Sequence, residues 1–571
     1  MKSAGGTAHA ERVEASGEVP RQPVILEYKF TLLSLTILVG VMLRIWGLDF
    51  GLPYTYHYDE HFFINTALKL GAGVLNNPPY AATGFSNILF GEYGLYYVLG
   101  RLFGSFTSSD AFQLAFRRDP TVFYVLGRLT TAVLGTATIL ALYVLGSSAS
   151  GVTAGLAAAI LLSVSFLHIR DCHYAVPDVA MSFFVAVAIA LAAVALRNGN
   201  RRYIIAASFI GGLAVAMKWT GLPVALPVGW GAIRVQTARE RVALRDVPRS
   251  LAQCAAFFLL GFALGSPEVI LNPAPYVREA LRQHAAGQAG GFEIWQVDTL
   301  PGWMFYGKTL LYGLGPLLLA AGIVGVIRRL ILVMRAYDGM SILLLGFPLS
   351  YYVLMGSTNH YFARYALPLV PFATLFAAEA FVVLSPWAKA RWGKLGSWLM
   401  IVLAGASVVQ PLGDSIRHDI LLTREDTRTL AKKWIEGHIP AATRIAVDWP
   451  VHGPPLSTEE KSMPHSEKVY SVVEIGGSGL SGHDLNWYRE RFDYLVTSSF
   501  IHDIPLLDRA LNLKRNAFYS ALDEELVRVR EFKPYQGDKE PAFIFDEIYG
   551  PAISLWERER PGPTLKLYRV K

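Results

Sequence analysis

The sequence predicts a polytopic α-helical membrane domain that is followed by a C-terminal α/β domain. Charged residues make up 17% of the chain and hydrophobic residues 53%, whereas an ordinary soluble domain carries about 25% charged residues. Long apolar segments recur between about residues 30 and 411, and the remainder has a soluble composition. We therefore divide the chain into a disordered cytoplasmic segment, 1–27, a membrane domain, 28–411, and an α/β domain, 412–571.

Apolar windows of membrane length predict about eleven transmembrane helices. The first apolar run is too long for the h-region of a secretory signal, so we expect it to remain as the first span. The windows are 30–48, 122–146, 152–167, 178–196, 203–217, 221–234, 251–270, 304–327, 340–356, 362–384 and 395–411.

Short basic loops predict the orientation of these spans, because cytoplasmic loops collect Lys and Arg. With the N-terminus in the cytoplasm, every strongly basic short loop lies on the cytoplasmic side, and an odd span count places the α/β domain outside. We expect a multi-pass protein of a bacterial plasma (inner) membrane. These loops also account for the net charge of +7, so no nucleic-acid partner is implied. They are residues 197–202, 234–249, 328–335 and 389–394.

The C-terminal region shows the alternation of a small α/β domain. The stretch "DTRTLAKKWIEGHIP" has helical periodicity and ends before a proline, and a second helix is expected within 505–513. We find no nucleophile elbow, phosphate loop or metal-ligand spacing here, so we assign this domain to acceptor recognition or partner docking. Strands are predicted over 444–448, 468–475, 492–499, 526–532, 542–548 and 565–570.

Ionisable residues gather on the predicted outer side. The first outer loop, about 50–120, begins with "YHYDEHFFI", which carries His57, Asp59, Glu60 and His61. The second outer loop, "HIRDCHYAVPD", and two later span ends add Arg170, His173, Asp178, Lys218 and Arg364. Charges at a membrane boundary are costly and usually functional. Their placement on one side favours an enzyme over a transporter, which would place them near the midplane.

Transfer of a sugar from a lipid phosphate would use this set of residues. The phosphate leaving group needs fixed cations, such as Lys218 and Arg364. The acceptor needs a carboxylate base, and Asp59 or Glu60 fits; neighbours in a helix point about 100° apart, so one of them faces the reacting atoms. A displacement with one base and no enzyme nucleophile inverts the anomeric centre. No nucleotide-binding fingerprint appears, so a lipid-linked donor is the consistent choice.

Four motifs resemble the bacterial relatives of protein O-mannosyltransferases and of lipid A aminoarabinose transferases, which are GT-C fold glycosyltransferases. They are "YHYDEHFF", "RDCHYAVPDVAMSFF", "GLAVAMKWTGL" and "HYFARYALPLVPF". The resemblance covers roughly residues 30–411 and implies a GT-C fold, a polyprenyl-phosphate-sugar donor and an inverting transfer in the cell envelope. It implies a catalytic base at Asp59 with Glu60 beside it, and donor phosphate or sugar contacts from Arg170, Asp178, Lys218 and Arg364. His173 of the second outer loop is a further candidate for a donor contact.

The acceptor stays open, because the C-terminal domain matches neither relative. A protein Ser/Thr hydroxyl, as in protein glycosylation, a lipid and a cell-wall glycan are all compatible acceptors. No cofactor is certain. A divalent cation held by His57 and His61 is an alternative to a polar rim around a sugar site. A flippase or exporter of a lipid-linked sugar is the alternative function.

Each site residue also has a purely structural explanation. Asp59 could be a charge at a helix N-terminus, and Asp178 could cap the span after Pro177. Lys218 could extend its amine to lipid headgroups, and Arg364 could bind the same headgroups.

Overall fold

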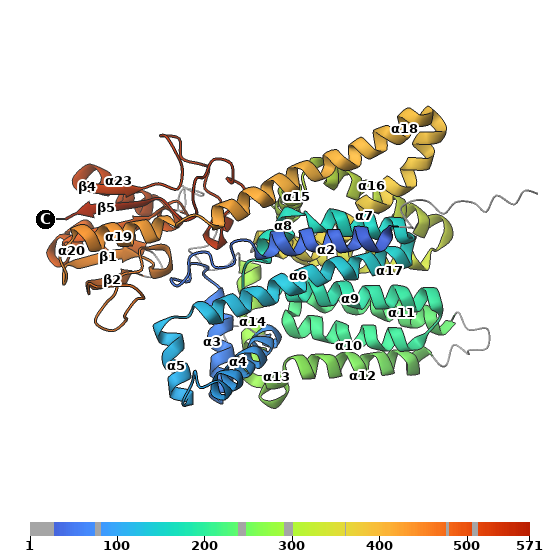
Figure 1. The fold of residues 1–571 in the computed structure, drawn as a ribbon, viewed down its shortest axis with the longest axis horizontal. Coiled ribbons are helices and arrows are strands. Elements are labelled where there is room, and N and C mark those ends of the chain that lie inside the picture. Colours follow the sequence, from blue (N-terminus) through green and yellow to red (C-terminus); the bar gives the residue numbers. More distant parts are fainter. Residues whose placement is uncertain are drawn as a thin grey trace, which may run out of the picture.

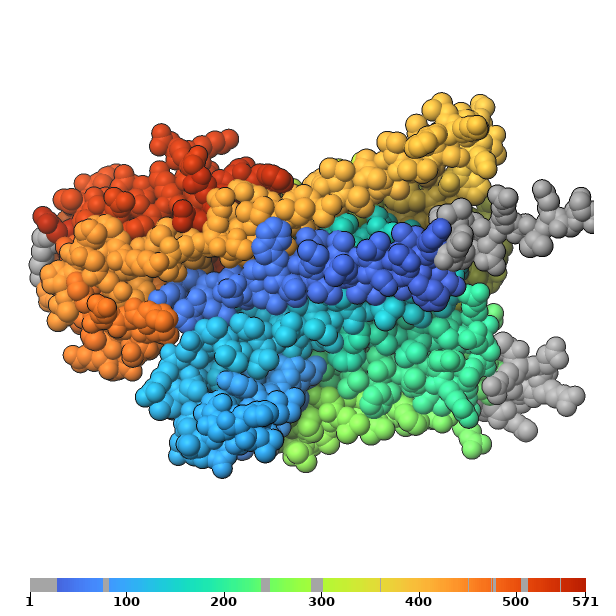
Figure 2. Space-filling view, viewed as in Figure 1, coloured from blue at the N-terminus to red at the C-terminus, as the bar shows by residue number. Residues whose placement is uncertain are grey.

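The computed structural model describes residues 28–74, 82–237, 247–289, 301–359, 361–475, 479–504 and 512–570. The predicted cytoplasmic segment, 1–27, and most of the helix expected within 505–513 lie outside these ranges. A bundle of long helices forms one part of the molecule and an α/β part lies at one end of it (Figure 1). The first outer loop and the α/β part lie side by side at that end (Figure 2), where the Tyr56 hydroxyl and the Thr429 hydroxyl are 2.7 Å apart.

The chain is a polytopic membrane protein, and six of its described helical segments are long and apolar enough to cross a bilayer. The count of about eleven spans stays a prediction. At the centre, α9 packs against α6, α10 and α11. The bundle helices are α2 (Lys29–Ile45), α6 (Thr121–Ser150), α7 (Val152–Ser163), α9 (Pro177–Asn198), α10 (Arg201–Met217), α11 (Ala225–Thr237), α12 (Val247–Gly265), α15 (Gly302–Leu314), α16 (Pro316–Ala336), α17 (Gly339–Gly356) and α18 (Val370–Leu422).

Small residues allow close packing in this bundle. A Cβ atom at Gly212 would lie 1.9 Å from the carbonyl oxygen of Phe258, and one at Gly261 would lie 2.0 Å from that of Phe209. The backbones of α10 and α12 therefore touch directly, as small residues permit at membrane helix interfaces.

One predicted span was wrong. The window 304–327 was expected to be one helix, but it is divided at Gly315, which has a φ of 77° and is followed by Pro316 at the start of α16. The windows 362–384 and 395–411 lie, from Val370 onward, in α18, which consists of two helices joined by a kink at Gly393, where φ is 60° and ψ is −138°, so they remain two separate helices as expected. The expected domain boundary at 411/412 lies inside α18, which continues to Leu422.

Shorter helices form the connections at the end near the α/β part. The first outer loop folds into three helices beside the bundle (Figure 1), and two short 3-10 segments follow α10 and precede α18. These elements are α3 (Glu60–Gly71), α4 (Gly84–Leu102), α5 (Ser109–Arg118), α8 (Phe166–Asp171), η1 (Trp219–Val224), α13 (Pro267–Leu271), α14 (Pro273–Ala289) and η4 (Ala363–Leu369).

The α/β part contains a five-stranded sheet with the order β2-β1-β3-β5-β4. Strands β2, β1 and β3 are parallel, whereas β5 runs antiparallel to β3 and β4. The strands are β1 (Arg444–Asp448), β2 (Ser471–Ile475), β3 (Tyr494–Ser498), β4 (Val527–Phe532) and β5 (Leu565–Arg569), and the helices are α19 (Thr427–His438), α20 (Leu485–Arg491), α21 (Ser499–His502) and α23 (Leu513–Glu525).

The strand predicted over 542–548 was wrong. This segment forms a 3-10 turn, η7 (Phe545–Tyr549), outside the sheet. Its polar groups bond to the helical bundle instead of to a neighbouring strand: the Asp546 carboxylate accepts a hydrogen bond from the Ala363 backbone N–H at 2.8 Å. A tertiary contact therefore overrides the β propensity of its apolar residues.

Candidate active site

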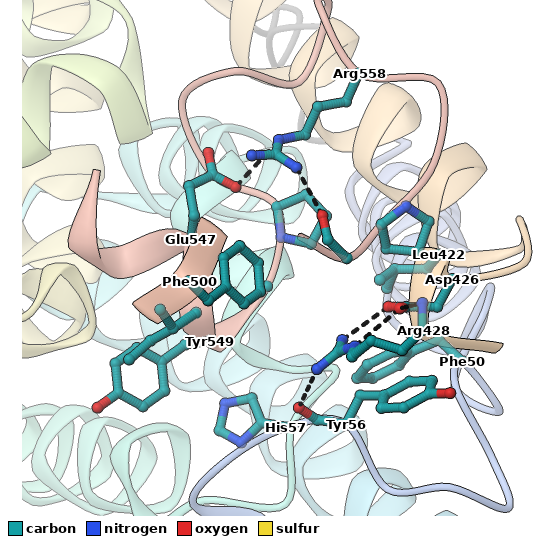
Figure 3. A pocket seen from close by; sticks show the side chains of 15 residues that line it. Phe50, Tyr56, His57, Leu422, Asp426, Arg428, Phe500, Glu547, Tyr549 and Arg558 are labelled. Atoms are coloured by element: carbon teal, nitrogen blue, oxygen red, sulfur yellow. Dashed lines mark hydrogen bonds and ion pairs between the residues drawn. The ribbon is translucent and has the colours of Figure 1, made fainter. Parts of the chain in front are cut away.

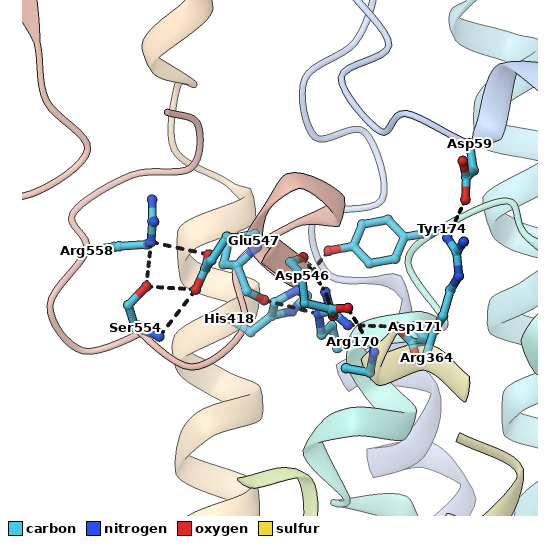
Figure 4. Close-up of polar contacts among 12 residues, drawn as sticks. Asp59, Arg170, Asp171, Tyr174, Arg364, His418, Asp546, Glu547, Ser554 and Arg558 are labelled. Atoms are coloured by element: carbon cyan, nitrogen blue, oxygen red, sulfur yellow. Dashed lines mark hydrogen bonds and ion pairs between the residues drawn. The ribbon is translucent and has the colours of Figure 1, made fainter. Parts of the chain in front are cut away.

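A buried ion pair joins the first outer loop to the start of the last long helix. Asp59 lies at the N-cap position of α3 and is 3% exposed. Arg364 lies in η4, and its Nη1 donates a hydrogen bond to Asp59 Oδ2 (Figure 4). The Nε of Arg364 is buried and has no hydrogen-bond partner among the described residues. The guanidinium therefore keeps an unused donor.

A second ion pair joins the second outer loop to the end of α10. Pro177 occupies the first position of α9 and Asp178 lies in the first turn, where a carboxylate interacts favourably with the helix dipole. Lys218 caps the C-terminus of α10, and its Nζ donates to Asp178 Oδ1 at 2.6 Å. The carboxylate of Asp178 thus joins the start of α9 to the end of α10.

The ring of Tyr365 connects the two ion pairs. Lys218 Nζ lies 4.1 Å from the ring centroid, and Arg364 Cζ lies 5.7 Å from it. Both distances fall within the range of cation–π attraction. The structure therefore gathers two cations and two carboxylates, all four predicted from the sequence, around one aromatic side chain.

Glu60 points away from this group although it follows Asp59 directly. Its two carboxylate oxygens accept hydrogen bonds from Arg128 Nε and Nη2, each at 2.8 Å. Oε1 also accepts from the Ala175 N–H at 2.9 Å, and Arg128 donates further to the carbonyls of Leu48 and Phe50. Both side chains are fully buried, so Glu60 holds the two outer loops together.

Arg170 is engaged by the α/β part. Its guanidinium pairs with Asp171 at 3.2 Å and with Asp546 of η7 at 2.9 Å, and it donates to the carbonyl oxygens of Asp546 and Pro551. Burial, with smaller contributions from the charges of Asp546 and Asp178, raises the pKa of Asp171 to about 7 although the charge of Arg170 lowers it. The expected phosphate ligand Arg170 thus anchors η7 to the bundle.

Tyr549 at the end of η7 covers one side of the Asp59–Arg364 pair. Its ring centroid lies 4.5 Å from Arg364 Cζ and 5.7 Å from the ring of His57. The other face of His57 stacks on Tyr174 at 4.5 Å. Burial, followed by the positive charge of Arg364, holds the pKa of His57 well below its usual value, so His57 is neutral near pH 7.

A small cavity lies behind Tyr549 and His57 (Figure 3). Its volume is about 20 Å³, and its lining includes Tyr56, Arg428 and Glu547. A space of this size holds about one water molecule. The residues that line it do not include the four charged side chains of the two ion pairs.

Three histidines predicted near the site have other surroundings. His57 lies before α3, which begins at Glu60, so His57 and His61 do not share a helix face, and a cation held by both stays an alternative. His173 is fully buried beside α18, 3.5 Å from Asp419. Within the described residues, His173 instead belongs to a group of three possible metal ligands, together with His418 and Asp419.

Sequence reasoning missed the contribution of η7 and of Arg128. Asp546 and Tyr549 were assigned to a strand or left without a role, although "FDEIYGP" combines adjacent acids with Gly-Pro, which is typical of a turn. Arg128 lies within an apolar window and was not singled out. A buried arginine in a predicted span is itself a signal, because it requires a buried partner.

Comparisons with known proteins agree with this architecture. The family described as dolichyl-phosphate-mannose-protein mannosyltransferase matches residues 125–266, which include Asp178 and Lys218. No curated protein matches the chain.

Solved structures resemble the chain over most of its length. The apo oligosaccharyltransferase of Archaeoglobus fulgidus has 12% identity and a TM-score of 0.53, over 95% of this chain and 88% of that one. The oligosaccharyltransferase AglB of the same organism, in complex with an inhibitory peptide and a dolichol-phosphate, has 12% identity and a TM-score of 0.50, over 86% and 72%. ArnT from Cupriavidus metallidurans, bound to undecaprenyl phosphate, has 12% identity and a TM-score of 0.48, over 88% and 96%.

The chain has a GT-C fold. The matched family segment and this fold together indicate a mannosyltransferase-like glycosyltransferase.

Proposed function

We propose that this protein transfers a sugar from a polyprenyl-phosphate donor to an extracytoplasmic acceptor, with inversion at the anomeric carbon. The observation that carries the proposal is the pair of cation–carboxylate contacts, Arg364 with Asp59 and Lys218 with Asp178, whose two cations both lie within cation–π range of Tyr365. The AglB structure was solved with a dolichol-phosphate, which supports a lipid-phosphate donor here. The acceptor is a protein Ser/Thr hydroxyl, a lipid or a cell-wall glycan.

Donor binding would rearrange these contacts. The donor phosphate competes with Asp59 for Arg364, which has a spare Nε donor, and Lys218 supplies a second charge from a side chain that is 20% exposed. Charge-assisted hydrogen bonds to phosphate are short and strong. Because Arg364 also neutralises Asp59, binding of the donor phosphate to Arg364 releases that carboxylate for catalysis.

Asp59 then acts as the general base. It accepts the proton of the acceptor hydroxyl while the acceptor oxygen forms a bond to the anomeric carbon. The bond between that carbon and the phosphate oxygen breaks, and its electron pair leaves with polyprenyl phosphate, whose charge Arg364 and Lys218 stabilise. One displacement without an enzyme nucleophile inverts the anomeric centre.

Release of labelled sugar from a panel of polyprenyl-phosphate donors tests the proposal. The full-length protein in lipid nanodiscs is incubated with each donor and with a membrane extract that supplies acceptors. We expect release by the wild type with at least one donor and a loss of about 10²–10⁴-fold in Asp59→Asn, which is the usual contribution of a general base. Asp49→Asn, an exposed acid of the same loop, is the matched control.

Two outcomes would contradict the proposal. Turnover by Asp59→Asn at the wild-type rate would remove the assigned base. Movement of intact labelled donor between the leaflets of proteoliposomes, with no release from any donor, would instead indicate a flippase or exporter.

A further inference from the structure

Three possible metal ligands meet beneath the second outer loop, apart from the ion pairs proposed for catalysis. His173 lies in the connection between α8 and α9, while His418 and Asp419 lie near the C-terminal end of α18. All three are fully buried. One ligand atom from each lies within 4.8 Å of the others, so a single ion could contact all three residues.

The hydrogen bonds of His173 leave one ring nitrogen facing oxygen atoms. Its Nδ1 lies 2.9 Å from the Ile169 carbonyl oxygen, and because a carbonyl oxygen only accepts, this shorter contact is a hydrogen bond in the neutral tautomer that carries its proton on Nδ1. The Nε2 then presents a lone pair toward the Trp46 carbonyl oxygen at 3.1 Å and toward Asp419 Oδ1 at 3.5 Å. A lone pair that faces two oxygens is repulsive unless a cation lies between them.

Asp419 has acceptor capacity that the protein does not use. Its Oδ1 lies 3.1 Å from His418 Nδ1, and its buried Oδ2 has no hydrogen-bond partner within the described part of the chain. The nearby guanidinium of Arg44 bonds instead to the carbonyls of Gly40 and Ser163 and to His168. An unpaired buried carboxylate oxygen is costly, and a bound cation would satisfy it.

We propose that His173, His418 and Asp419 bind a divalent transition-metal ion, with zinc as the best match to two imidazoles and a carboxylate. Tetrahedral zinc with bonds of about 2.0–2.1 Å places its ligand atoms roughly 3.3–3.4 Å apart. The observed contacts of Asp419 Oδ1 to the two histidines, 3.1 and 3.5 Å, bracket that spacing. The Trp46 carbonyl is the fourth ligand, and the Nδ1 contact of His173 is the outer hydrogen bond that orients a metal-binding histidine.

The role of this site is structural. Its ligands are closed to solvent, whereas a catalytic zinc keeps an open position. The ion would fasten the loop between α8, which contains Arg170, and α9, which contains Asp178, to the end of α18 where the chain enters the α/β part. This inference does not depend on the proposed transfer reaction, because it concerns assembly of the outer loops.

Metal analysis of the purified full-length protein tests the inference. The protein, prepared without a histidine tag, is equilibrated with zinc and dialysed before elemental analysis. We expect about one zinc per chain in the wild type and less than about one tenth in His418→Gln and in Asp419→Asn. His438→Gln, an exposed histidine of α19, is the matched control and retains the metal.

X-ray absorption of the zinc-loaded wild type provides a measurement that does not depend on whether a variant folds. We expect a nitrogen/oxygen shell at about 2.0–2.1 Å that includes imidazole scattering. A wild type that holds no zinc would overturn the proposal and leave an imidazolium–carboxylate network in its place. Unchanged zinc content in both variants, or a sulfur-containing shell, would overturn it as well.

Discussion

Buried arginine–carboxylate pairs at the two ends of the helical bundle differ in how fully their hydrogen-bonding groups are used. At the end far from the α/β part, every nitrogen of Arg329 in α16 has a partner, from Glu379 of α18, Ser150 and Ser341. At the near end, Arg364 contacts Asp59 through one nitrogen, and its Nε has no partner among the described residues.

We interpret this difference as one between structural charges and the charges that we propose to act in sugar transfer. A saturated buried pair contributes order and has no donor left for a ligand, whereas an incompletely used pair can exchange its partner for a substrate anion. Glu60 and Arg128 belong to the saturated type, although Glu60 is adjacent to Asp59. Proximity to a functional residue in sequence is therefore a poor guide to role.

The largest effect on stability is expected from breaking the Arg329–Glu379 pair. Glu379→Gln leaves the Arg329 charge buried and unpaired, which we expect to lower the free energy of unfolding by about 3–5 kcal/mol. Chemical unfolding in detergent measures this loss. Glu490→Gln, from an exposed pair with Arg491, should change it by less than about 1 kcal/mol. Equal stability of both variants would contradict the structural role.

Replacing Arg364 should affect catalysis instead of stability, because its hydrogen-bonding groups are not all engaged by the described residues. Arg364→Lys retains the charge but loses the fork-shaped donor set, and we expect kcat to fall by about 10²–10³-fold, as when one donor to a developing anion is removed. The unfolding midpoint should stay near that of the wild type. Arg101→Lys, an exposed arginine of α4, serves as the control. A variant with normal kcat and low stability would assign Arg364 to the structural type.

A smaller effect is expected at η7. Tyr549→Leu removes the ring beside Arg364, and we expect KM for the donor to rise about 5- to 30-fold, since a partly desolvated cation–π contact contributes about 1–2 kcal/mol. Tyr549→Phe keeps the ring and should restore the wild-type KM. Steady-state kinetics with varied donor separates KM from kcat, and a change confined to kcat would argue against a binding role.

A separate, pH-dependent effect on stability is expected at Asp171. Its folded pKa of about 7 lies above the ordinary value of 3.8, so the folded state binds the proton more tightly than the unfolded state does. Stability therefore decreases as pH rises from about 4 to about 7 and is constant above that. We expect Asp171→Asn to flatten this part of the thermal midpoint profile. A profile identical to that of the wild type would show that Asp171 ionises normally.

Much of the candidate site could be predicted because membrane insertion restricts where charges lie. Hydropathy placed Asp59, Asp178, Lys218 and Arg364 at the ends of apolar segments, and basic loops placed these ends on one side. Which cation meets which carboxylate could not be predicted, since that depends on how α3, α9, α10 and η4 pack. The turn of η7 was missed because its partners lie about 180–380 residues away in sequence.

The sequence by itself determined the membrane character of the chain, the alternation of helices and strands near its C-terminus, and the motifs that carry the charged residues. These are local properties, because hydrophobicity and periodicity act over one turn or one span. Only the tertiary structure decided that Glu60 binds Arg128, that Arg170 anchors η7, and that His173 faces His418 and Asp419. Buried polar groups must find partners wherever the packed chain brings them, and sequence spacing does not encode that choice.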